Sequence, residues 1–283
     1  MTKSRLRVFG IIGYPIDHTL SPCLHNAAFE KKGINANYVP FAVHPNRLRE
    51  AVEGIRAMGI QGVNVTVPHK LEVMRYLDRL DKSAERLGAV NTIACENGAL
   101  IGYNTDGTGF IRSLEHERIS LVGKQIAVVG GGGAARAIVG ALVDAGVASI
   151  AVLNRTYEKA EFIAQTFSTA GLPVEPYHIN GDIDAVLKNC HICINCTSLG
   201  LRDGDPLPIP MQWITARHIL IDLIYNPAET PFVKAGKEKG AKTINGYGML
   251  VYQAAEAFRM WTGIEPPIEV MWAAGLKELQ NMR

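Results

Sequence analysis

The sequence predicts an α/β protein of two domains, the second of which is built around a doubly wound parallel sheet. Three observations predict this fold. The chain has 283 residues, and a domain commonly contains about 100–200 residues, so its length is that of two domains. Hydrophobic residues make up 47% of the chain and charged residues 20%, which is typical of a globular protein with a large core. From residue 123 onward, continuous apolar runs alternate with helical patterns, as in a parallel sheet covered by helices.

Strand and helix signals also alternate through the first hundred residues. Ser21 and Pro22 predict the start of a helix, with Ser21 as its cap and Pro22 in its first turn. The pair Asn97-Gly98 is typical of a tight turn and predicts a hairpin. The expected strands cover residues 8–13, 38–43, 62–67, 89–95 and 99–103, and the expected helices cover residues 21–32 and 47–58.

The second half is expected to contain longer strand–helix units. Residues 125–130 are apolar at nearly every position, which is typical of a strand that is buried on both faces. Further strands are expected over residues 148–153, 191–195 and 218–223, and helices over residues 133–144 and 156–167. Two closing helices, over residues 246–261 and 267–280, are expected to pack back on the first domain.

Composition excludes several classes of protein. The 29 basic and 27 acidic residues give a net charge of +2, whereas nucleic-acid and membrane-surface proteins cluster positive charge. No apolar run reaches the roughly 20 residues that span a bilayer. The short, glycine-rich run after the basic N-terminus does not read as a signal-peptide core, so a cytoplasmic location is predicted.

The five cysteines do not form a disulfide pattern, because their number is odd. Cys190, Cys193 and Cys196 recur at intervals of three residues, which resembles a set of metal ligands. They fall in a short apolar run, however, where a free cysteine behaves as a small hydrophobic residue, and we predict no metal site.

A glycine-rich turn joins the first strand and helix of the second half. The pattern Gly130-x-Gly132-x-x-Ala135 follows a strand and opens a helix, the context in which such a turn binds a dinucleotide pyrophosphate. The N–H groups at the helix N-terminus would bind the phosphates. The alternative is a glycine-rich turn without a ligand. The expected cofactor contacts in this turn are Gly130, Gly131, Gly132, Gly133 and Ala134.

The residues after the next strand indicate which dinucleotide is bound. NAD enzymes usually carry an acid about 20 residues beyond the first glycine, where it binds the ribose hydroxyls. Here that place is taken by Asn154, Arg155 and Thr156, followed by Lys159. Two cations would neutralise a 2′-phosphate, so the sequence predicts NADP. The alternative is a helix capped by Thr156 with solvated basic neighbours.

The motifs of the whole chain resemble those of the shikimate dehydrogenase family. They read GYPIDHTLSP at 13–22, NVTVPHK at 64–70, GAVNT at 88–92, GYNTDG at 102–107, NRT at 154–156, YNP at 225–227 and GYGML at 246–250, with Gln253 after them. The resemblance implies NADPH-dependent, reversible reduction of 3-dehydroshikimate to shikimate in aromatic amino-acid biosynthesis, the chorismate pathway. It also implies an N-terminal α/β substrate domain of residues 1–106, completed by residues 247–283, and a Rossmann-type NADP domain of residues 107–246.

The resemblance assigns the chemistry to Lys70 and Asp106. A ketone that accepts hydride becomes an alkoxide and needs a proton, and a lysine is protonated at neutral pH. A neighbouring carboxylate would keep the ammonium charged and oriented, although Asp106 could equally bind a ring hydroxyl of the substrate. The alternatives are a solvated lysine at Lys70 and a helix cap at Asp106.

The other expected contacts with substrate and cofactor are polar or small residues in the same motifs. Thr66, Asn91 and Gln253 match the family positions that bind the substrate hydroxyls, and Thr19, Ser21 and Tyr225 match those that bind its carboxylate. Leu223 and Gly246 are expected beside the nicotinamide, in a cleft between the domains.

The chain departs from the family pattern at three positions. The family usually has serine at Thr19, often has aspartate at Asn245 and commonly has methionine at Leu223. The changes at Asn245 and Leu223 are mild, whereas Thr19 keeps the hydroxyl but adds a methyl group, which is expected to affect the geometry of carboxylate binding or the tolerance for the substrate ring. We interpret His18, His25 and His69 as structural or supporting residues. Two rival functions share the scaffold: a quinate/shikimate dehydrogenase that uses NAD, and a non-catalytic ligand-sensing module. A folate-linked methylene dehydrogenase would share only the architecture. The sequence leaves open whether the protein is a monomer or a homodimer.

Overall fold

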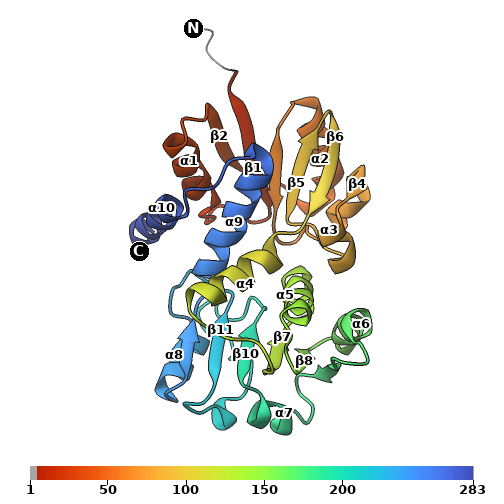
Figure 1. Cartoon of the computed structure of the whole chain (residues 1–283), viewed down its shortest axis with the longest axis vertical. Helices are drawn as coiled ribbons and strands as arrows, with labels where there is room; N and C mark the ends of the chain where they lie inside the picture. The colour runs from red at the N-terminus through yellow and green to blue at the C-terminus, as the bar shows by residue number, and fades with distance from the viewer. Residues whose placement is uncertain (1–4, 283) are drawn as a thin grey trace. The chain divides into compact units, whose positions relative to one another are not determined.

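The computed structural model describes residues 5–282, which fold into two compact units (Figure 1). The first unit contains the chain up to Gly109 together with the segment from Val251 onward, and the second unit contains Phe110–Leu250. Helices α4 (Asp106–His116) and α9 (Tyr247–Thr262) each include one of the two boundaries.

The first unit is built on a mixed six-stranded sheet of order β2-β1-β3-β5-β6-β4. Strand β1 pairs in parallel with β2 and β3, β3–β5 and β5–β6 are antiparallel, and β4 pairs in parallel with β6. The predicted hairpin is confirmed, because Asn97 and Gly98 both adopt positive φ between β5 and β6. The strands are β1 (Arg7–Gly13), β2 (Ala36–Ala42), β3 (Gly62–Val65), β4 (Arg79–Leu80), β5 (Thr92–Glu96) and β6 (Ala99–Tyr103).

Helices cover this sheet and bring the end of the chain back to it. Helix α10 packs against α1 of the first unit (Figure 1). Gly62 allows the Trp261 indole to approach β3 closely, and Trp261 Nε1 donates a hydrogen bond to the Ile93 carbonyl over 3.0 Å. The helices are α1 (Ser21–Lys31), η1 (Pro45–Arg47), α2 (Leu48–Ala57), η2 (Glu72–Tyr76), α3 (Lys82–Leu87) and α10 (Ile268–Asn281).

The start of α1 differs from the prediction. Leu20 occupies the N-cap position and Ser21 is already helical, so the prediction that Ser21 caps the helix is wrong. The physical reason is the Thr19 hydroxyl, which accepts a hydrogen bond from Ser21 N over 3.3 Å and serves the N-terminal donor in its place. The Ser21 hydroxyl is thereby left for other contacts.

The second unit contains a six-stranded sheet of order β12-β11-β10-β7-β8-β9, in which every pairing is parallel. The predicted doubly wound parallel sheet is therefore confirmed. Its strands are β7 (Gln125–Val129), β8 (Ser149–Asn154), β9 (Val174–His178), β10 (Ile192–Asn195), β11 (Ile219–Asp222) and β12 (Lys242–Ile244). Its helices are α5 (Gly133–Asp144), α6 (Tyr157–Phe167), α7 (Asp184–Asn189), η3 (Met211–Trp213) and α8 (Pro231–Glu238).

Each unit has its own apolar core. One cluster lies on β3, β5 and α2 of the first unit and includes Val52, Val63 and Ile93. Another lies between α7, α8 and the second sheet and includes Leu187 and Phe232. Within residues 5–282, no helix has the length and apolar character that a bilayer crossing requires.

Candidate functional site

Lys70 and Asp106 form a buried ion pair in the first unit. Lys70 lies in the loop that leaves β3, and Asp106 is the first residue of α4. The distance from Lys70 Nζ to Asp106 Oδ2 is 2.5 Å, and the two side chains are 16% and 5% exposed. Limited solvent contact means that salt screens this pair much less than a surface pair. The fold thus holds an ammonium and a carboxylate together.

The carboxylate of Asp106 is held from both sides. Its Oδ1 accepts a hydrogen bond from Asn91 Nδ2 over 2.8 Å, while its Oδ2 accepts from Lys70. Asp106 N donates to Asn104 Oδ1 over 3.0 Å, so Asn104 serves the backbone at the start of α4. The alternative reading of Asp106 as a helix cap therefore does not describe this carboxylate.

Asn91 connects Asp106 to two further polar residues. Its Nδ2 lies 2.9 Å from Thr105 Oγ1 and 3.3 Å from Gln253 Oε1, and its Oδ1 accepts a hydrogen bond from Thr105 N over 2.8 Å. Gln253 lies on α9, so the returning helix brings it to the start of β5 and the start of α4. Four of the predicted site residues, Lys70, Asn91, Asp106 and Gln253, are thus in one hydrogen-bonded cluster.

A buried chain of hydrogen bonds extends from Asn91 to Ser21. Thr92 Oγ1 donates to Asn91 Oδ1 over 2.9 Å, and Asn64 Nδ2 donates to Thr92 Oγ1 over 3.0 Å. The Tyr38 hydroxyl in turn donates to Asn64 Oδ1 over 2.7 Å and is also hydrogen-bonded to Ser21. Burial raises the pKa of Tyr38 well above its ordinary value, so the phenol remains a neutral donor.

The remaining predicted residues of the first unit lie at the start of α1 and in the loop after β3. Thr19 Oγ1 is 3.3 Å from Ser21 Oγ, so these two hydroxyls converge at the start of α1. Thr66 lies in the same loop as Lys70, where Thr66 N donates to the Ile12 carbonyl and the Thr66 carbonyl accepts from His69 N. His69 is buried, and its Nε2 is 2.7 Å from the Val43 carbonyl, which fixes the loop.

Sequence reasoning did not assign roles to Tyr38, Asn64, Thr92, Thr105 or Gly109. Asn64, Thr92 and Thr105 fall inside the quoted motifs, but the sequence does not show that these polar side chains are buried and hydrogen-bonded to one another. Gly109 lies within α4, and a Cβ there would stand 2.6 Å from Gln253 N. A glycine in a helical pattern costs about 1 kcal/mol relative to alanine and often marks a close approach, which is the signal that could have found it.

The glycine turn of the second unit lies at the carboxyl end of β7. Gly130 has a φ of 129°, a conformation that L side chains rarely adopt, and a Cβ there would be 3.2 Å from the Cys196 backbone. Gly132 is the N-cap of α5, with no side-chain cap bond and no atom within 4 Å of its Cβ position. Gly133 and Ala134 open α5 and are half-buried. The N–H groups at the start of α5 are thus left for an anion.

The predicted dinucleotide readers lie next to this turn. A Cβ on Gly131 would stand 2.7 Å from Lys159 Cβ and 2.9 Å from Asn154 Nδ2, so the end of β8 and the start of α6 abut the turn. Thr156 is the N-cap of α6, yet its hydroxyl makes no cap hydrogen bond. Arg155, Thr156 and Lys159 are exposed. The arrangement presents two cations and a hydroxyl beside a phosphate-binding turn.

Leu223 and Gly246, the two residues predicted beside the nicotinamide, are neighbours in the second unit. A Cβ on Gly246 would overlap the Leu223 carbonyl, and Gly246 N donates to the Ile224 carbonyl over 3.0 Å. Tyr225 follows in the same loop and therefore belongs to the second unit, unlike the other predicted substrate contacts. Among the described residues, no group of three or more His, Cys, Asp or Glu side chains could hold a metal ion.

Comparison with known proteins finds one family along nearly the whole chain. Residues 11–93 match the shikimate dehydrogenase substrate binding domain, residues 113–200 match shikimate/quinate 5-dehydrogenase, and residues 246–274 match the shikimate 5′-dehydrogenase C-terminal domain. Shikimate dehydrogenase (NADP(+)) of Methanococcus maripaludis is 43% identical over 96% of both chains, and that of Methanocaldococcus jannaschii is 45% identical over 96% of both chains. A crystal structure of a shikimate dehydrogenase in complex with NADP+ has a TM-score of 0.90 and 43% identity, covering 99% of this chain and 98% of that one.

Proposed function

Because this chain belongs to the shikimate dehydrogenase family, we propose that it catalyses the NADPH-dependent, reversible reduction of 3-dehydroshikimate to shikimate in aromatic amino-acid biosynthesis. The observation that supports the chemistry best is the buried Lys70–Asp106 pair, held by Asn91 in a polar cluster. An ammonium in this setting is suited to protonate an alkoxide.

The proposed proton donor is Lys70. When it is bound, NADPH supplies the hydride for reduction of the substrate ketone. As negative charge develops on the ketone oxygen, the Lys70 ammonium stabilises it and transfers a proton from Nζ. Asp106 accepts a hydrogen bond from Nζ and limits the directions in which the remaining N–H groups point. In the oxidative direction the neutral amine takes up the proton of the alcohol.

Asn91, Thr66 and Gln253 are proposed to bind the substrate hydroxyls, and Thr19, Ser21 and Tyr225 its carboxylate. Asn91 and Gln253 lie in hydrogen-bonded contact with each other and with the Asp106 region, which supports their assignment. The convergent hydroxyls of Thr19 and Ser21 support a carboxylate contact, since hydroxyls donate hydrogen bonds to carboxylate oxygens.

Three sets of residues are proposed to bind NADP. The pyrophosphate would contact the glycine turn, Gly130–Ala134. The 2′-phosphate would contact Asn154, Arg155, Thr156 and Lys159, and the nicotinamide would lie beside Leu223 and Gly246. The open Cβ space at Gly132 and the uncapped start of α5 fit a bound phosphate. The exposed side chains of Arg155 and Lys159 beside the turn fit a second phosphate, the 2′-phosphate of NADP. Residues 107–246 are accordingly proposed as the NADP domain, and residues 1–106 with 247–283 as the substrate domain.

We further propose that the protein acts in the cytoplasm. All five cysteines are free thiols in the structure, which is typical of proteins from a reducing compartment.

The experiment that tests the function measures steady-state rates with NADP and NAD, each against shikimate and quinate. We expect turnover of shikimate with NADP to exceed the other three combinations. Arg155→Ala should raise KM for NADP roughly tenfold and change KM for NAD much less, because only NADP carries the phosphate that the guanidinium would bind. A clear preference of the unaltered protein for NAD would contradict the cofactor assignment.

Lys70→Ala tests the chemical role in the same assay. We expect kcat to fall at least ~10²-fold, the usual contribution of general acid–base catalysis, with little change in shikimate affinity measured by calorimetry. Lys82→Ala is the matched control, because Lys82 is an exposed lysine at the start of α3 in the same unit. Equal activity in the two variants would exclude Lys70 as the proton donor and would favour a ligand-sensing module.

A further inference from the structure

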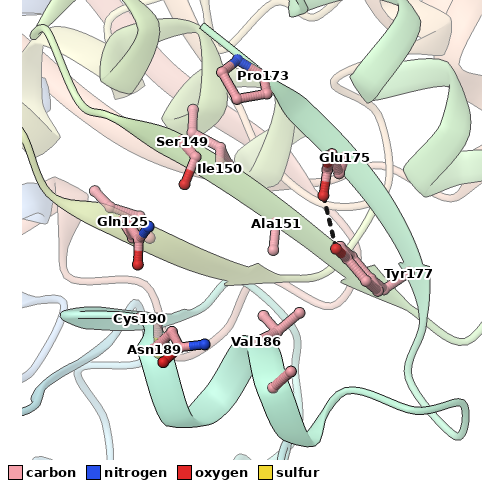
Figure 2. A pocket seen from close by; sticks show the side chains of 12 residues that line it. Gln125, Ser149, Ile150, Ala151, Pro173, Glu175, Tyr177, Val186, Asn189 and Cys190 are labelled. Atoms are coloured by element: carbon pink, nitrogen blue, oxygen red, sulfur yellow. Dashed lines mark hydrogen bonds between the residues drawn. The ribbon is translucent and has the colours of Figure 1, made fainter.

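The second unit contains a cavity of about 310 Å³ between its sheet and α7 (Figure 2). Gln125 and Ser149, the first residues of β7 and β8, line it, so it lies toward the amino ends of these strands, whereas the glycine turn lies at their carboxyl end. Its lining contains both apolar and polar side chains and includes the hydrogen-bonded pair of Glu175 and Tyr177, whose oxygens are 2.7 Å apart. The proposed reaction with shikimate makes no use of this cavity.

Cys190 lines the same cavity, and its thiol contacts a second thiol. The distance from Cys190 Sγ to Cys193 Sγ is 3.2 Å, and the two residues have C-x-x-C spacing. Cys190 directly follows α7, whereas Cys193 lies in β10 between β7 and β11 and has no exposed surface. Since the sulfurs of a disulfide are about 2.05 Å apart, bond formation requires an approach of about 1 Å. The movement has to come from Cys190 at the end of the short helix α7, because β10 is fixed by strands on both sides.

We propose that Cys190 and Cys193 form an oxidisable dithiol site whose substrates are small disulfides that reach Cys190 through the cavity. The Cys190 thiolate attacks one sulfur of the small disulfide, the S–S bond of that molecule breaks, and one thiolate leaves. The Cys193 thiolate then attacks Cys190 Sγ, the mixed disulfide breaks, and the second thiolate leaves. In total the protein loses two electrons and two protons, and the small disulfide becomes two thiols.

The surroundings of the two sulfurs favour this order of events. The pKa of Cys190 is lowered, because the hydrogen bond that its thiolate accepts from Cys193, together with the nearby positive charge of Arg217, outweighs the opposing effect of burial. The pKa of Cys193 is raised by that same hydrogen bond and by burial. The thiolate is the nucleophile, so Cys190, the cysteine that lines the cavity, is also the more reactive of the two. By contrast, burial raises the pKa of Cys23 to about 11, which disfavours reaction there.

The site is tested with the full chain and bis(2-hydroxyethyl) disulfide as the oxidant. After the reaction the remaining thiols are blocked with N-ethylmaleimide in denaturant, and trypsin releases residues 189–202, which contain Cys190, Cys193 and Cys196. We expect this peptide to carry one maleimide and an internal disulfide, whereas the peptide from the untreated protein carries three maleimides. A peptide that still carries three maleimides, or a stable hydroxyethyl adduct on Cys190, would overturn the proposal.

Single substitutions establish which sulfurs are joined and how the oxidant arrives. The internal disulfide should persist in Cys196→Ser and be lost in Cys190→Ser; a Cys193–Cys196 disulfide would overturn the assignment. Ala151 also lines the cavity, so Ala151→Leu should slow oxidation at least threefold. Cys95→Ser is the control and should oxidise at the unaltered rate. An unchanged rate in Ala151→Leu would exclude the cavity as the route, and circular dichroism of each variant verifies that it is folded.

Discussion

His25 is completely buried in the first unit and stacks face to face on Tyr38, with ring centroids 4.3 Å apart. Neither ring nitrogen makes a hydrogen bond of good geometry with a described residue. Burial lowers the pKa of His25 to about 3, and a contact with Asn64 offsets this only in part. The imidazole is therefore a neutral ring that packs against the Tyr38 ring, whose hydroxyl is hydrogen-bonded to Asn64.

We expect His25→Phe to remove part of the acid sensitivity of folding. The unfolded imidazole titrates near 6.5, so its pKa is lowered on folding and the unfolded chain takes up this proton first. The contribution of neutral His25 to the free energy of unfolding is therefore fully present above pH 6.5 and is lost as the pH falls toward 3. Between about pH 7 and pH 4.5, urea denaturation should show the unaltered protein losing roughly 2.5 kcal/mol more than His25→Phe. His18→Phe, at an exposed histidine, is the control. An equal loss in all three proteins would show that His25 does not titrate this way.

The residues of the site were predictable to different degrees. The motifs identified Lys70, Asp106 and Asn91 because each is a reactive or polar residue in an unusual string of neighbours. They could not reveal that Asn91 Nδ2 is within hydrogen-bonding distance of Thr105, Asp106 and Gln253 together, because Asn91 and Gln253 are 162 positions apart in the sequence. The place of Tyr38 was equally hidden, since a tyrosine in a strand is ordinarily a packing residue.

At the scale of elements, contact between α4 and α9 depends on a glycine. A Cβ on Gly109 would stand 2.6 Å from Gln253 N and 2.7 Å from Gln253 Cβ. Since the first of these is backbone, α9 must shift to accommodate a methyl group. Gln253 and its hydrogen bonds to Asn91 and Thr105 would move with it.

Gly109→Ala should therefore lower both stability and substrate binding. Overpacking typically costs about 1–3 kcal/mol, and we expect a loss of this size in the free energy of unfolding, together with a higher KM for shikimate. Gly54→Ala is the matched control: Gly54 is also helical, and its added Cβ would be 3.4 Å from the Met58 methyl, an ordinary contact. That variant should gain up to about 1 kcal/mol from helix propensity. Stabilisation of both variants would refute the packing argument.

Elements with a strong local pattern were predictable from the sequence, and several short elements without one were not. The helix expected over residues 133–144 is observed as α5, Gly133–Asp144, because its apolar period and flanking glycines act locally. Strand β4 has two residues and exists through its pairing with Ile101 and Gly102. Strand β9 contains Pro176, and a proline argues against predicting a strand from the sequence. The strand nevertheless forms because it lies at the edge of the sheet, where a proline is tolerated. Such elements depend on partners that lie elsewhere in the chain.

At the scale of the whole molecule, the two units have separate sheets and separate cores. The proposed shikimate contacts lie in the first unit except for Tyr225, and the proposed NADP contacts all lie in the second. A ligand that binds only the folded state lowers the population of local openings in the segments it contacts. Each ligand alone should consequently protect a different part of the chain.

Hydrogen exchange with a single ligand tests this division. NADP+ alone should slow amide exchange at residues 130–134 and 154–159 and leave residues 64–70 and 91–106 little changed. Shikimate alone should do the reverse, with additional slowing around Gln253, because α9 contributes that residue to the Asn91 cluster. At a ligand concentration of about 100 times Kd, the free energy of local opening should rise by ~2–3 kcal/mol in the segments that open only when the ligand leaves. Arg155→Ala should weaken the NADP+ pattern alone, and Asn91→Ala the shikimate pattern alone. If shikimate instead protected the glycine turn, or NADP+ the Lys70 loop, the assignment of one ligand to each unit would be wrong even if the enzyme turned over as proposed.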